Sequence, residues 1–303
     1  MRKPVMVYTS LCAMVLLISA SPARAQNVLW VSPTGNDINA CTSSAPCATF
    51  QGAINKGSVS QINCLASGNY GQASITASIT IDCGAGNMGN IVVTNNGITI
   101  TGAATVVLRH LSMNGLEGAA AGIVTSSFSG TLIVENCMIH GYHNGPGIFF
   151  APAGGRGLLQ VSNSQIFDNS DGIVVSPGSG QIASVTLNGV ELIANLGIGL
   201  NFNGPGVVAG TMRNSVAGEN GTSGVVANAG QVFFTVEESS IIDNLTAGVV
   251  TKSPGSIVNV ASSTIGGNGT GVSAISGSII SFGDNHMSTN ATNGNFTSTT
   301  PLQ

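Results

Sequence analysis

A repeat of about two dozen residues constrains the fold of this chain more than any other feature. Eight similar units begin 22 to 27 residues apart, at Leu108, Val134, Val161, Leu187, Met212, Val236, Val260 and Phe282. Eight residues after these starts stand Leu116, Tyr142 and then an unbroken series of asparagines, Asn169, Asn195, Asn220, Asn244, Asn268 and Asn290. Short runs of alternating apolar residues fill each unit. They are separated by Gly, Asn and Ser, which indicates two or three short strands joined by turns.

Such a period is typical of one turn, or rung, of a parallel β-solenoid. Rungs stack about 4.8 Å apart, so equivalent residues form columns along the axis. Inward positions must then be aliphatic, and tight corners favour Gly or Asn because both tolerate positive φ. The recurrent Asn is expected to form a ladder in which each amide bonds to the amide of the next rung. The repeat therefore predicts an all-β protein with three short strands per rung and about nine to ten rungs.

The composition excludes several classes of protein. Charged residues make up 7% of the 303 residues, against about 25% in an average globular protein. Phosphate binding needs clustered Lys and Arg, so no nucleic-acid partner is expected. A hydrophobic content of 43% argues against disorder. Beyond the N-terminus no apolar run approaches the roughly 18 to 20 residues of a spanning helix, so we expect no integral membrane segment in the mature chain.

The first 25 residues have the order of a secretory signal peptide. Arg2 and Lys3 precede an apolar stretch over 11–20, and the small-residue sequence Ala23-Arg24-Ala25 follows. Cleavage after Ala25 would leave five basic residues against twelve acidic ones, a mildly anionic mature chain. The sequence therefore predicts an exported protein of the periplasm or the extracellular space.

Export permits disulfides, and five cysteines remain after cleavage. Because five is odd, at least one thiol is unpaired. Cys41 and Cys47 bracket a turn-rich loop that a local bridge could close, whereas Cys137 lies among apolar residues and is expected to be buried. Cys64 and Cys83 lie in two successive strand-like runs whose separation suits stacking.

The repeat resembles that of the right-handed parallel β-helix proteins of the pectin-lyase-like superfamily, of the exported bacterial type. The segments 28–37 and 46–54 are similar to the opening of many such proteins, where a strand and a short amphipathic helix cap the first rung. If Ile62 stacks under Ile81, Cys64 falls under Cys83, which supports a disulfide between them. The resemblance is specific for fold and not for activity, because the superfamily includes lyases, hydrolases, epimerases and adhesins.

These features divide the chain into four expected parts. Residues 1–25 are the signal peptide, 26–60 the N-terminal cap, 61–287 the β-helix and 288–303 a polar C-terminal tail. Within the cap, the apolar spacing of Phe50, Ala53 and Ile54 predicts a helix over 48–56.

Acidic residues recur at the position before the ladder Asn. The candidate binding residues there are Asp168, Glu219 and Asp243, together with the nearby Asp171. Spacings of one or two rungs fall within the range of about 5 to 9.5 Å that glycosidase carboxylate pairs show, and they would also suit Ca²⁺. The alternative is that these acids are solvated corner residues which supply the charge that solubility needs.

A second group of ionisable residues gathers in the first repeat units. It comprises Arg109, His110, Glu135, His140, Tyr142, His143 and Arg156. Uronate lyases and epimerases need a group that neutralises a carboxylate and a base that removes a proton. The candidate catalytic residues are therefore His140, Tyr142, His143 and Arg156. The alternative is that Arg109 and Glu135 form an exposed ion pair on adjacent rungs, as Arg213 and Glu237 would, and that His110 belongs to a polar ladder.

Two classes of function remain. One is a non-catalytic protein that binds a polysaccharide or an envelope component along a flat, Asn/Ser/Thr-rich face. The other is a polysaccharide-active enzyme, a uronate lyase or C5-epimerase before a glycoside hydrolase. The shortage of basic residues and of aromatic sugar-stacking residues favours binding without catalysis. No cofactor is expected unless the acids hold Ca²⁺.

Overall fold

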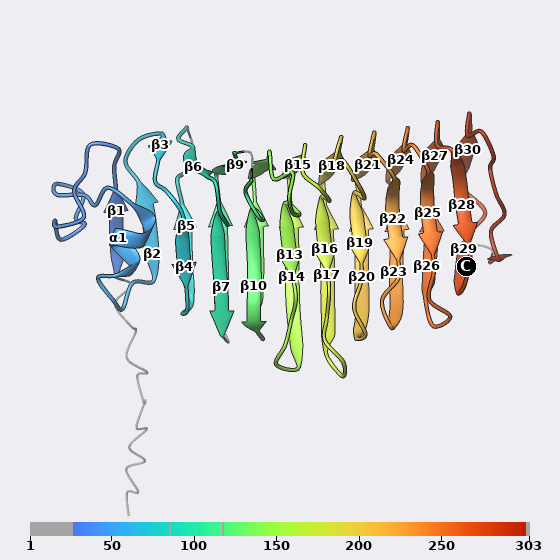
Figure 1. The fold of residues 1–303 in the computed structure, drawn as a ribbon, viewed down its shortest axis with the longest axis horizontal. Coiled ribbons are helices and arrows are strands. Elements are labelled where there is room, and N and C mark those ends of the chain that lie inside the picture. The colour runs from blue at the N-terminus through green and yellow to red at the C-terminus, as the bar shows by residue number, and fades with distance from the viewer. Residues whose placement is uncertain (1–26, 85, 103, 117, 301–303) are drawn as a thin grey trace, which may run out of the picture.

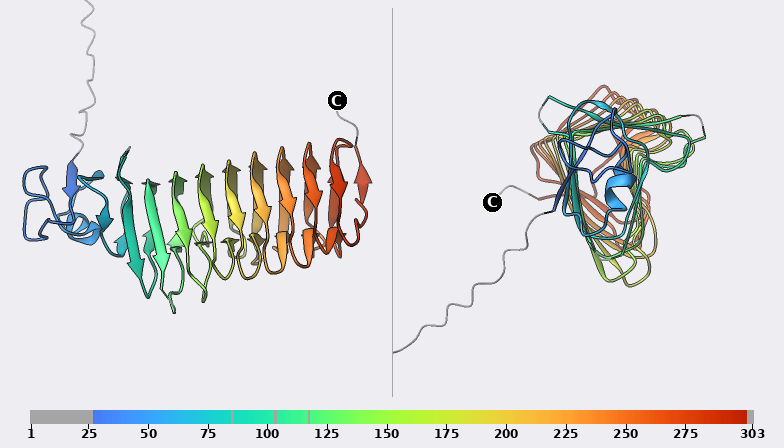
Figure 2. Two further views of the ribbon diagram at one scale, coloured as in Figure 1. Left: turned by 90° about the horizontal axis from the view of Figure 1, so that it is seen from above. Right: turned by 90° about the vertical axis from the view of Figure 1, so that its left-hand side faces the viewer.

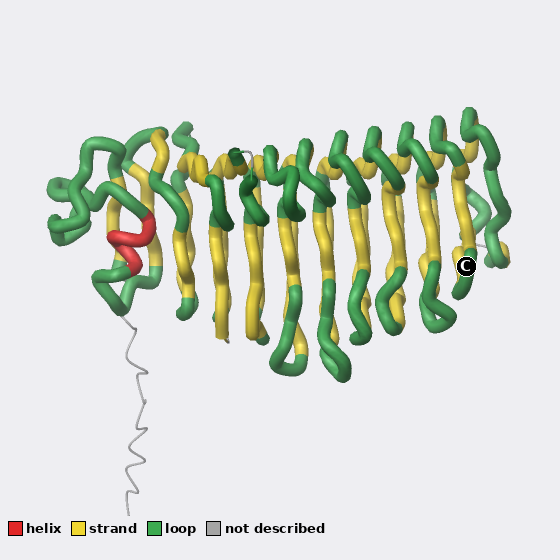
Figure 3. Tube along the Cα trace, in the orientation of Figure 1, coloured by secondary structure: helices red, strands yellow, loops and turns green. Residues whose placement is uncertain are grey.

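Three parallel sheets wind into a right-handed β-helix with one short helix at its N-terminal end (Figure 1). The computed structural model describes residues 27–300 except 85, 103 and 117. The signal peptide predicted for 1–25 lies outside the described residues. Most rungs contribute one strand to each of the three sheets, and Figure 3 shows the connecting loops projecting beyond the ends of the strands. The predicted fold class is confirmed.

We name the sheets A, B and C in the order in which the chain visits them within a rung. Sheet A contains β1 (Val28–Val31), β2 (Gln61–Cys64), β5 (Ile79–Asp82), β8 (Thr105–Arg109), β11 (Thr131–Glu135), β14 (Arg156–Ser162), β17 (Ile182–Asn188), β20 (Val207–Arg213), β23 (Gln231–Glu237), β26 (Ile257–Ala261), β29 (Ser278–Ser281) and β31 (Ser298–Thr299). Sheet B contains β3 (Gly68–Asn69), β6 (Gly89–Val93), β9 (Leu111–Gly115), β12 (Met138–His140), β15 (Gln165–Phe167), β18 (Glu191–Ile193), β21 (Val216–Gly218), β24 (Ser240–Ile242), β27 (Thr264–Gly266) and β30 (His286–Ser288). Sheet C contains β4 (Ala73–Ile75), β7 (Ile98–Gly102), β10 (Ile123–Phe128), β13 (Ile148–Phe150), β16 (Ile173–Val175), β19 (Leu200–Phe202), β22 (Ser223–Ala227), β25 (Ala247–Thr251) and β28 (Thr270–Ala274).

The register of sheet A follows the repeat. The unit starts from Leu108 to Val260 pair with one another in sequence order across seven strands. The last unit differs, because Val260 pairs with Ser281 rather than with Phe282. The corner between β29 and β30 has one residue more than the corresponding corners before it. The repeat alignment is therefore shifted by one residue in sheet A, whereas in sheet B His286 pairs with Thr264 as the repeat predicts.

Inward side chains fill the solenoid with aliphatic and aromatic groups, and Figure 2 shows the rungs superimposed around this core. Phe128 packs edge-on against Phe150 within sheet C, and Phe202 of sheet C packs against Phe234 of sheet A. Cys137 is buried in this core and unpaired, as expected. Because each inward column repeats at the strand spacing, alternation with polar outward residues is enough to specify which face is buried.

The asparagine ladder forms at the corner between sheets B and C. The backbone N–H and the side-chain NH₂ of each ladder Asn donate to the Oδ1 of the next, for example from Asn169 to Asn195 at 3.2 Å for both. The NH₂ group also donates to a carbonyl of sheet B, such as that of Ile139. The ladder amides from Asn169 to Asn268 are buried, so they satisfy backbone groups that water cannot reach.

A second ladder, which the sequence did not reveal, runs along the corner between sheets A and B. Buried serines there accept a hydrogen bond from the backbone N–H of the preceding rung, as Ser239 accepts from Ser215 and Ser263 from Ser239. Asn285 replaces serine in the last rung and accepts from Ser263 at 3.0 Å. Side-chain hydrogen bonds therefore hold both corners that flank sheet B. These bonds fix the positions of the outward-facing residues next to each corner.

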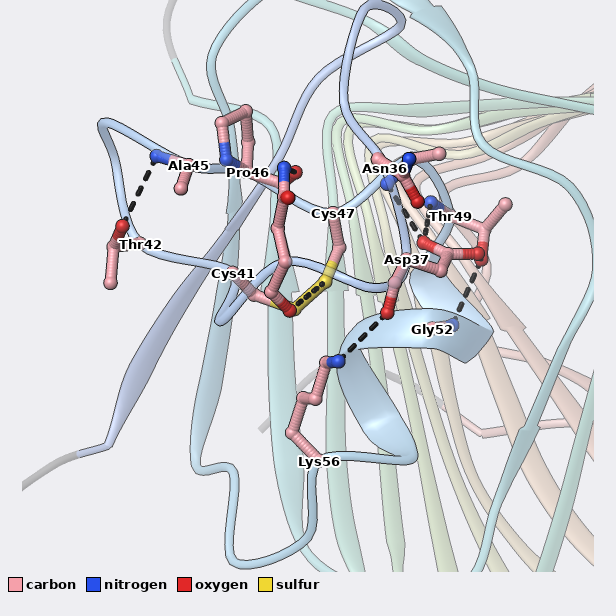
Figure 4. The surroundings of a disulfide bond; sticks show 12 residues. Asn36, Asp37, Cys41, Thr42, Ala45, Pro46, Cys47, Thr49, Gly52 and Lys56 are labelled. Atoms are coloured by element: carbon pink, nitrogen blue, oxygen red, sulfur yellow. Dashed lines mark hydrogen bonds between the residues drawn. A yellow bond between two sulfur atoms is a disulfide. The ribbon is translucent and has the colours of Figure 1, made fainter.

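The N-terminal cap contains α1 (Phe50–Ile54), which is shorter than the predicted 48–56 helix. Thr49 caps it by accepting from the Gly52 N–H, and Phe50 and Ala53 face the core. Figure 4 shows the Asp37 carboxylate beside this helix start, where it accepts from the Ala48 and Thr49 backbones at 2.8 and 2.9 Å. A short helix held in this way covers the end of the stack and protects its edge from pairing.

Both predicted disulfides are confirmed. Cys41 is bonded to Cys47 (Figure 4), and Cys64 is bonded to Cys83. Ile62 pairs with Ile81, which is the register on which the second bridge depended. Two disulfides indicate a compartment outside the reducing cytoplasm. Within the described part of the chain, no helix has the length and apolar character needed to cross a membrane.

Candidate functional site

The acidic candidates at the corner between sheets B and C form one column. Asp168, Glu219 and Asp243 all have positive φ, at 54, 56 and 55 degrees, and each stands just before a ladder Asn. Glu219 and Asp243 lie exposed on neighbouring rungs, and neither carboxylate has a hydrogen-bond partner among the residues that the structure describes. Ala194 occupies the rung between Asp168 and Glu219, so Asp168 stands apart from the other two.

Asp171 has a structural role in the rung that follows it. One of its oxygens accepts from the Ile198 N–H at 2.7 Å and the other from the Asn201 amide at 3.0 Å. Both bonds hold the turn that leads into β19, so this carboxylate is already engaged. The structure does not bring the four acidic candidates together. The described residues contain no group of three or more His, Cys, Asp or Glu side chains placed to hold a metal ion.

Of the two histidine candidates, His143 contacts an acid and His140 stacks on an aromatic ring. The His143 Nε2 lies 3.0 Å from the Asp168 Oδ1, and both side chains are about half exposed. His140 stacks on Phe167 with ring centroids 4.8 Å apart and planes 5 degrees from parallel. Burial lowers the pKa of His140, although Asp168 partly opposes the shift. Because the two rings stack on each other, one face of each is covered by its neighbour.

The remaining two catalytic candidates lie elsewhere. Tyr142 is fully buried, its hydroxyl has no hydrogen-bond partner in the described chain, and burial raises the pKa of this phenol. Arg156 begins β14 at the corner between sheets C and A, and its Nε donates to the Ser184 Oγ at 2.9 Å. The expected constellation of His140, Tyr142, His143 and Arg156 is therefore split between the core and two different corners.

A more compact ionic cluster lies at the corner between sheets A and B. The His110 Nδ1 is 2.8 Å from the Asp82 Oδ1, which also accepts from the Gly84 N–H. Arg109 is bonded to Glu135 on the next rung, as expected. Asp82 was missing from the sequence-based group, although its pairing with Arg109 follows once Ile81 is aligned with Leu108.

A shallow groove of about 370 Å³ lies beside this cluster. Its lining residues are Met88, Asn136, Cys137, Met138, Asn163, Ser164, Gln165, Gly189 and Glu191. Asn136 and Asn163 share the corner column with His110, all three with positive φ. Both amides are exposed and make no side-chain hydrogen bond within the described residues. Gln165 and Glu191 also line the groove, and the Gln165 amide donates to Glu191 at 2.8 Å. We call this feature the corner groove.

Comparisons with known proteins place this geometry in a structural class. No family model and no curated protein matches the sequence. Among solved structures, a pectate lyase, Pel9A, superposes with a TM-score of 0.67 at 18% identity, over 90% of this chain and 79% of that one. The chain has the pectin-lyase-like β-helix fold. A lacto-N-biosidase from Eubacterium ramulus aligns more loosely, with a TM-score of 0.47 at 8% identity, over 92% of this chain and 68% of that one.

The cations of this β-helix are largely paired with acids or backbone carbonyls. Arg213 is bonded to Glu237 and lies near Glu238, and the hydrogen bond that the guanidinium donates to Glu237 raises the pKa of Arg213. Lys56 donates to the Asp37 carbonyl at 2.7 Å (Figure 4). Exposed pairs of this kind contribute little to stability, because solvent screens them. These pairs matter more for ligand binding than for stability, because a guanidinium already bonded to a carboxylate is less available to a ligand carboxylate.

Proposed function

We propose that this chain is an exported β-helix protein that binds a polysaccharide along the corner groove without cleaving it. The observation that supports the proposal most strongly is that two exposed amides, Asn136 and Asn163, line the groove. Each offers an NH₂ donor and a carbonyl acceptor to the hydroxyl groups of a sugar. Gln165 and Glu191 supply further polar groups in the lining.

The fold supports a carbohydrate ligand by analogy only. Pel9A is named as a pectate lyase, so a β-helix of this shape can hold a polysaccharide chain against its rungs. Export is supported by the order of residues in 1–25 and by the two disulfides.

Proton NMR of a polysaccharide panel tests the proposal. Pectate, alginate, glucuronan and neutral glycans are each incubated with the mature protein, with and without Ca²⁺. We expect selective broadening of sugar resonances from at least one glycan and no new signals. The Asn136→Gly/Asn163→Gly double variant keeps the corner backbone, because Gly accepts positive φ, and should abolish the broadening. Broadening that persists in the variant would exclude the corner groove, and the absence of broadening from every glycan would exclude the function.

A polysaccharide lyase or C5-epimerase is the second candidate, and the Asp82–His110 pair favours it. An Asp that accepts from Nδ1 leaves Nε2 as a base, which is the arrangement of a general acid–base pair. New alkene or anomeric signals in the same NMR panel would establish this reading. His110→Asn, a residue that the neighbouring corner positions already use, should then abolish the new signals and leave the fold intact.

A further inference from the structure

One outward column of sheet A runs from the N-terminal cap to the corner groove. Register pairs place Trp30 beside Asn63, Asn63 beside Asp82, Asp82 beside Arg109, and Arg109 beside Glu135. Four steps at the strand spacing make this column about 19 Å long. Glu135 directly precedes Asn136 of the corner groove, so column and groove are continuous. We call these five residues the edge column.

Trp30 presents its indole on the outer surface of the first strand. It alternates with the buried Leu29 and Val31, so its side chain points away from the core, and it is partly exposed. An indole combines a flat apolar face with a polar N–H. The C–H-bearing face of a pyranose ring packs on such a surface, which makes Trp30 suited to one sugar unit at the end of the column.

The next position offers hydrogen bonds. The Asn63 Oδ1 accepts from the Gln61 amide at 2.7 Å, so the Asn63 side chain is oriented. Its NH₂ group has no acceptor in the described part of the chain and lies on the same outward column as Trp30. An oriented donor beside an aromatic face can select a sugar hydroxyl at a fixed distance from the stacked ring.

The charges of the edge column select against an acidic chain. Asp82 and Glu135 contribute two carboxylates, and Arg109 contributes one guanidinium that Glu135 already occupies. His110 is bonded to Asp82 rather than directed at a ligand. A uronate polymer would add a carboxylate per sugar unit to a surface that is already net negative, at a cost in repulsion. An uncharged chain meets no such penalty.

From this geometry we infer that the polysaccharide site extends along the edge column to Trp30 and that its ligand is an uncharged glycan lying parallel to the solenoid axis. The inference rests on the proposed function and adds the class of ligand and the position of an aromatic subsite. Trp30 stacks on one sugar unit, Asn63 and Asp82 bond to hydroxyls, and the corner groove receives the continuation of the chain.

Intrinsic fluorescence provides a direct test, because Trp30 is the only tryptophan in the sequence. Cellohexaose, mannohexaose and N-acetylated chitohexaose are titrated into the mature protein, with hexagalacturonate as the acidic counterpart. We expect a saturable change of emission with at least one neutral probe, at the dissociation constant that calorimetry gives. Trp30→Ala should weaken that binding about tenfold or more, as aromatic anchors do. Phe233→Ala removes an aromatic side chain that is 47% exposed on β23, far from the edge column, and should leave the binding unchanged.

Failure of the inference is distinct from failure of the function. Suppose that calorimetry detects binding of a neutral probe, but tryptophan emission does not change and Trp30→Ala binds with equal affinity. That result would confine the site to the corner groove and would overturn only its extension along the edge column. Tighter binding of hexagalacturonate than of every neutral probe would overturn the charge argument. The absence of heat with all four probes, together with silence in the polysaccharide NMR panel, would contradict the proposed function itself.

Discussion

Removal of one ladder amide should destabilise the β-helix far more than removal of an outward asparagine. Asn220 is 1% exposed and makes four side-chain hydrogen bonds. Its NH₂ group donates to the Leu192 carbonyl at 3.1 Å and to the Asn244 Oδ1 at 2.9 Å. Its Oδ1 accepts from the backbone N–H and the side-chain NH₂ of Asn195, both at 3.1 Å.

Asn220→Ala would leave the buried Asn195 N–H without an acceptor and would remove the amide bonds to the Leu192 carbonyl, the Asn244 Oδ1 and the Asn195 NH₂. The buried orphan costs about 1 to 3 kcal/mol, and the loss of the other amide bonds adds about 1 to 2 kcal/mol. We therefore expect the free energy of unfolding to fall by about 2 to 5 kcal/mol. The measurement is guanidinium unfolding followed by circular dichroism in the β band, with the midpoint compared at an unchanged slope.

Asn259→Ala is the matched control, because Asn259 lies on the outer face of β26 and is only partly buried. We expect it to change the free energy of unfolding by less than about 1 kcal/mol. Equal effects of the two substitutions would refute the argument that buried amide bonds hold the corner between sheets B and C.

Three further predictions concern the cap and the cysteines. Cys64→Ala with Cys83→Ala, which opens a loop of sequence separation 19, should cost about 3 kcal/mol of stability in a guanidinium titration; an unchanged midpoint would contradict this. Burial raises the pKa of the Cys137 thiol to about 12, so a disulfide thiol reagent at pH 8 should label no thiol in the native protein and one after unfolding. Burial raises the pKa of Asp37, but hydrogen bonds from Thr49 outweigh it and leave that pKa below its ordinary 3.8. The stabilisation by Asp37 is therefore complete at neutral pH and is lost as the pH falls through the folded pKa. Thermal midpoints between pH 6 and pH 2.5 should fall more steeply in the wild type than in Asp37→Asn, and parallel curves would argue against this.

The stacking of rungs was predictable because one periodic constraint decides many positions at once. Inward aliphatic residues and corner asparagines recur at one spacing, and a single alignment of Ile62 with Ile81 placed the second disulfide. The predicted register is wrong only at Phe282. The corner that follows contains one extra residue, and its small polar residues resemble those of the other corners, so the sequence does not show the insertion.

The candidate site was harder to predict because side-chain direction depends on what the neighbouring rungs leave open. Tyr142 occupies a ladder position and turns inward, where Gly97, Gly115 and Gly122 make room for its ring. Nothing in the sequence around Tyr142 shows those glycines to be its neighbours. Arg156 follows a loop and opens the next strand of sheet A, so its closeness in sequence to His143 hid a corner between them.

The binding account is tested most directly by the side-chain amide region of a proton–nitrogen correlation spectrum, recorded while a neutral glycan is added to the mature protein. Asn136→Gly and Asn163→Gly assign the two corner resonances, and the buried ladder amides serve as internal references. The account predicts that the Asn136 and Asn163 resonances shift saturably while the ladder resonances stay fixed. Saturable shifts confined to other amides, with both corner resonances unmoved, would contradict it.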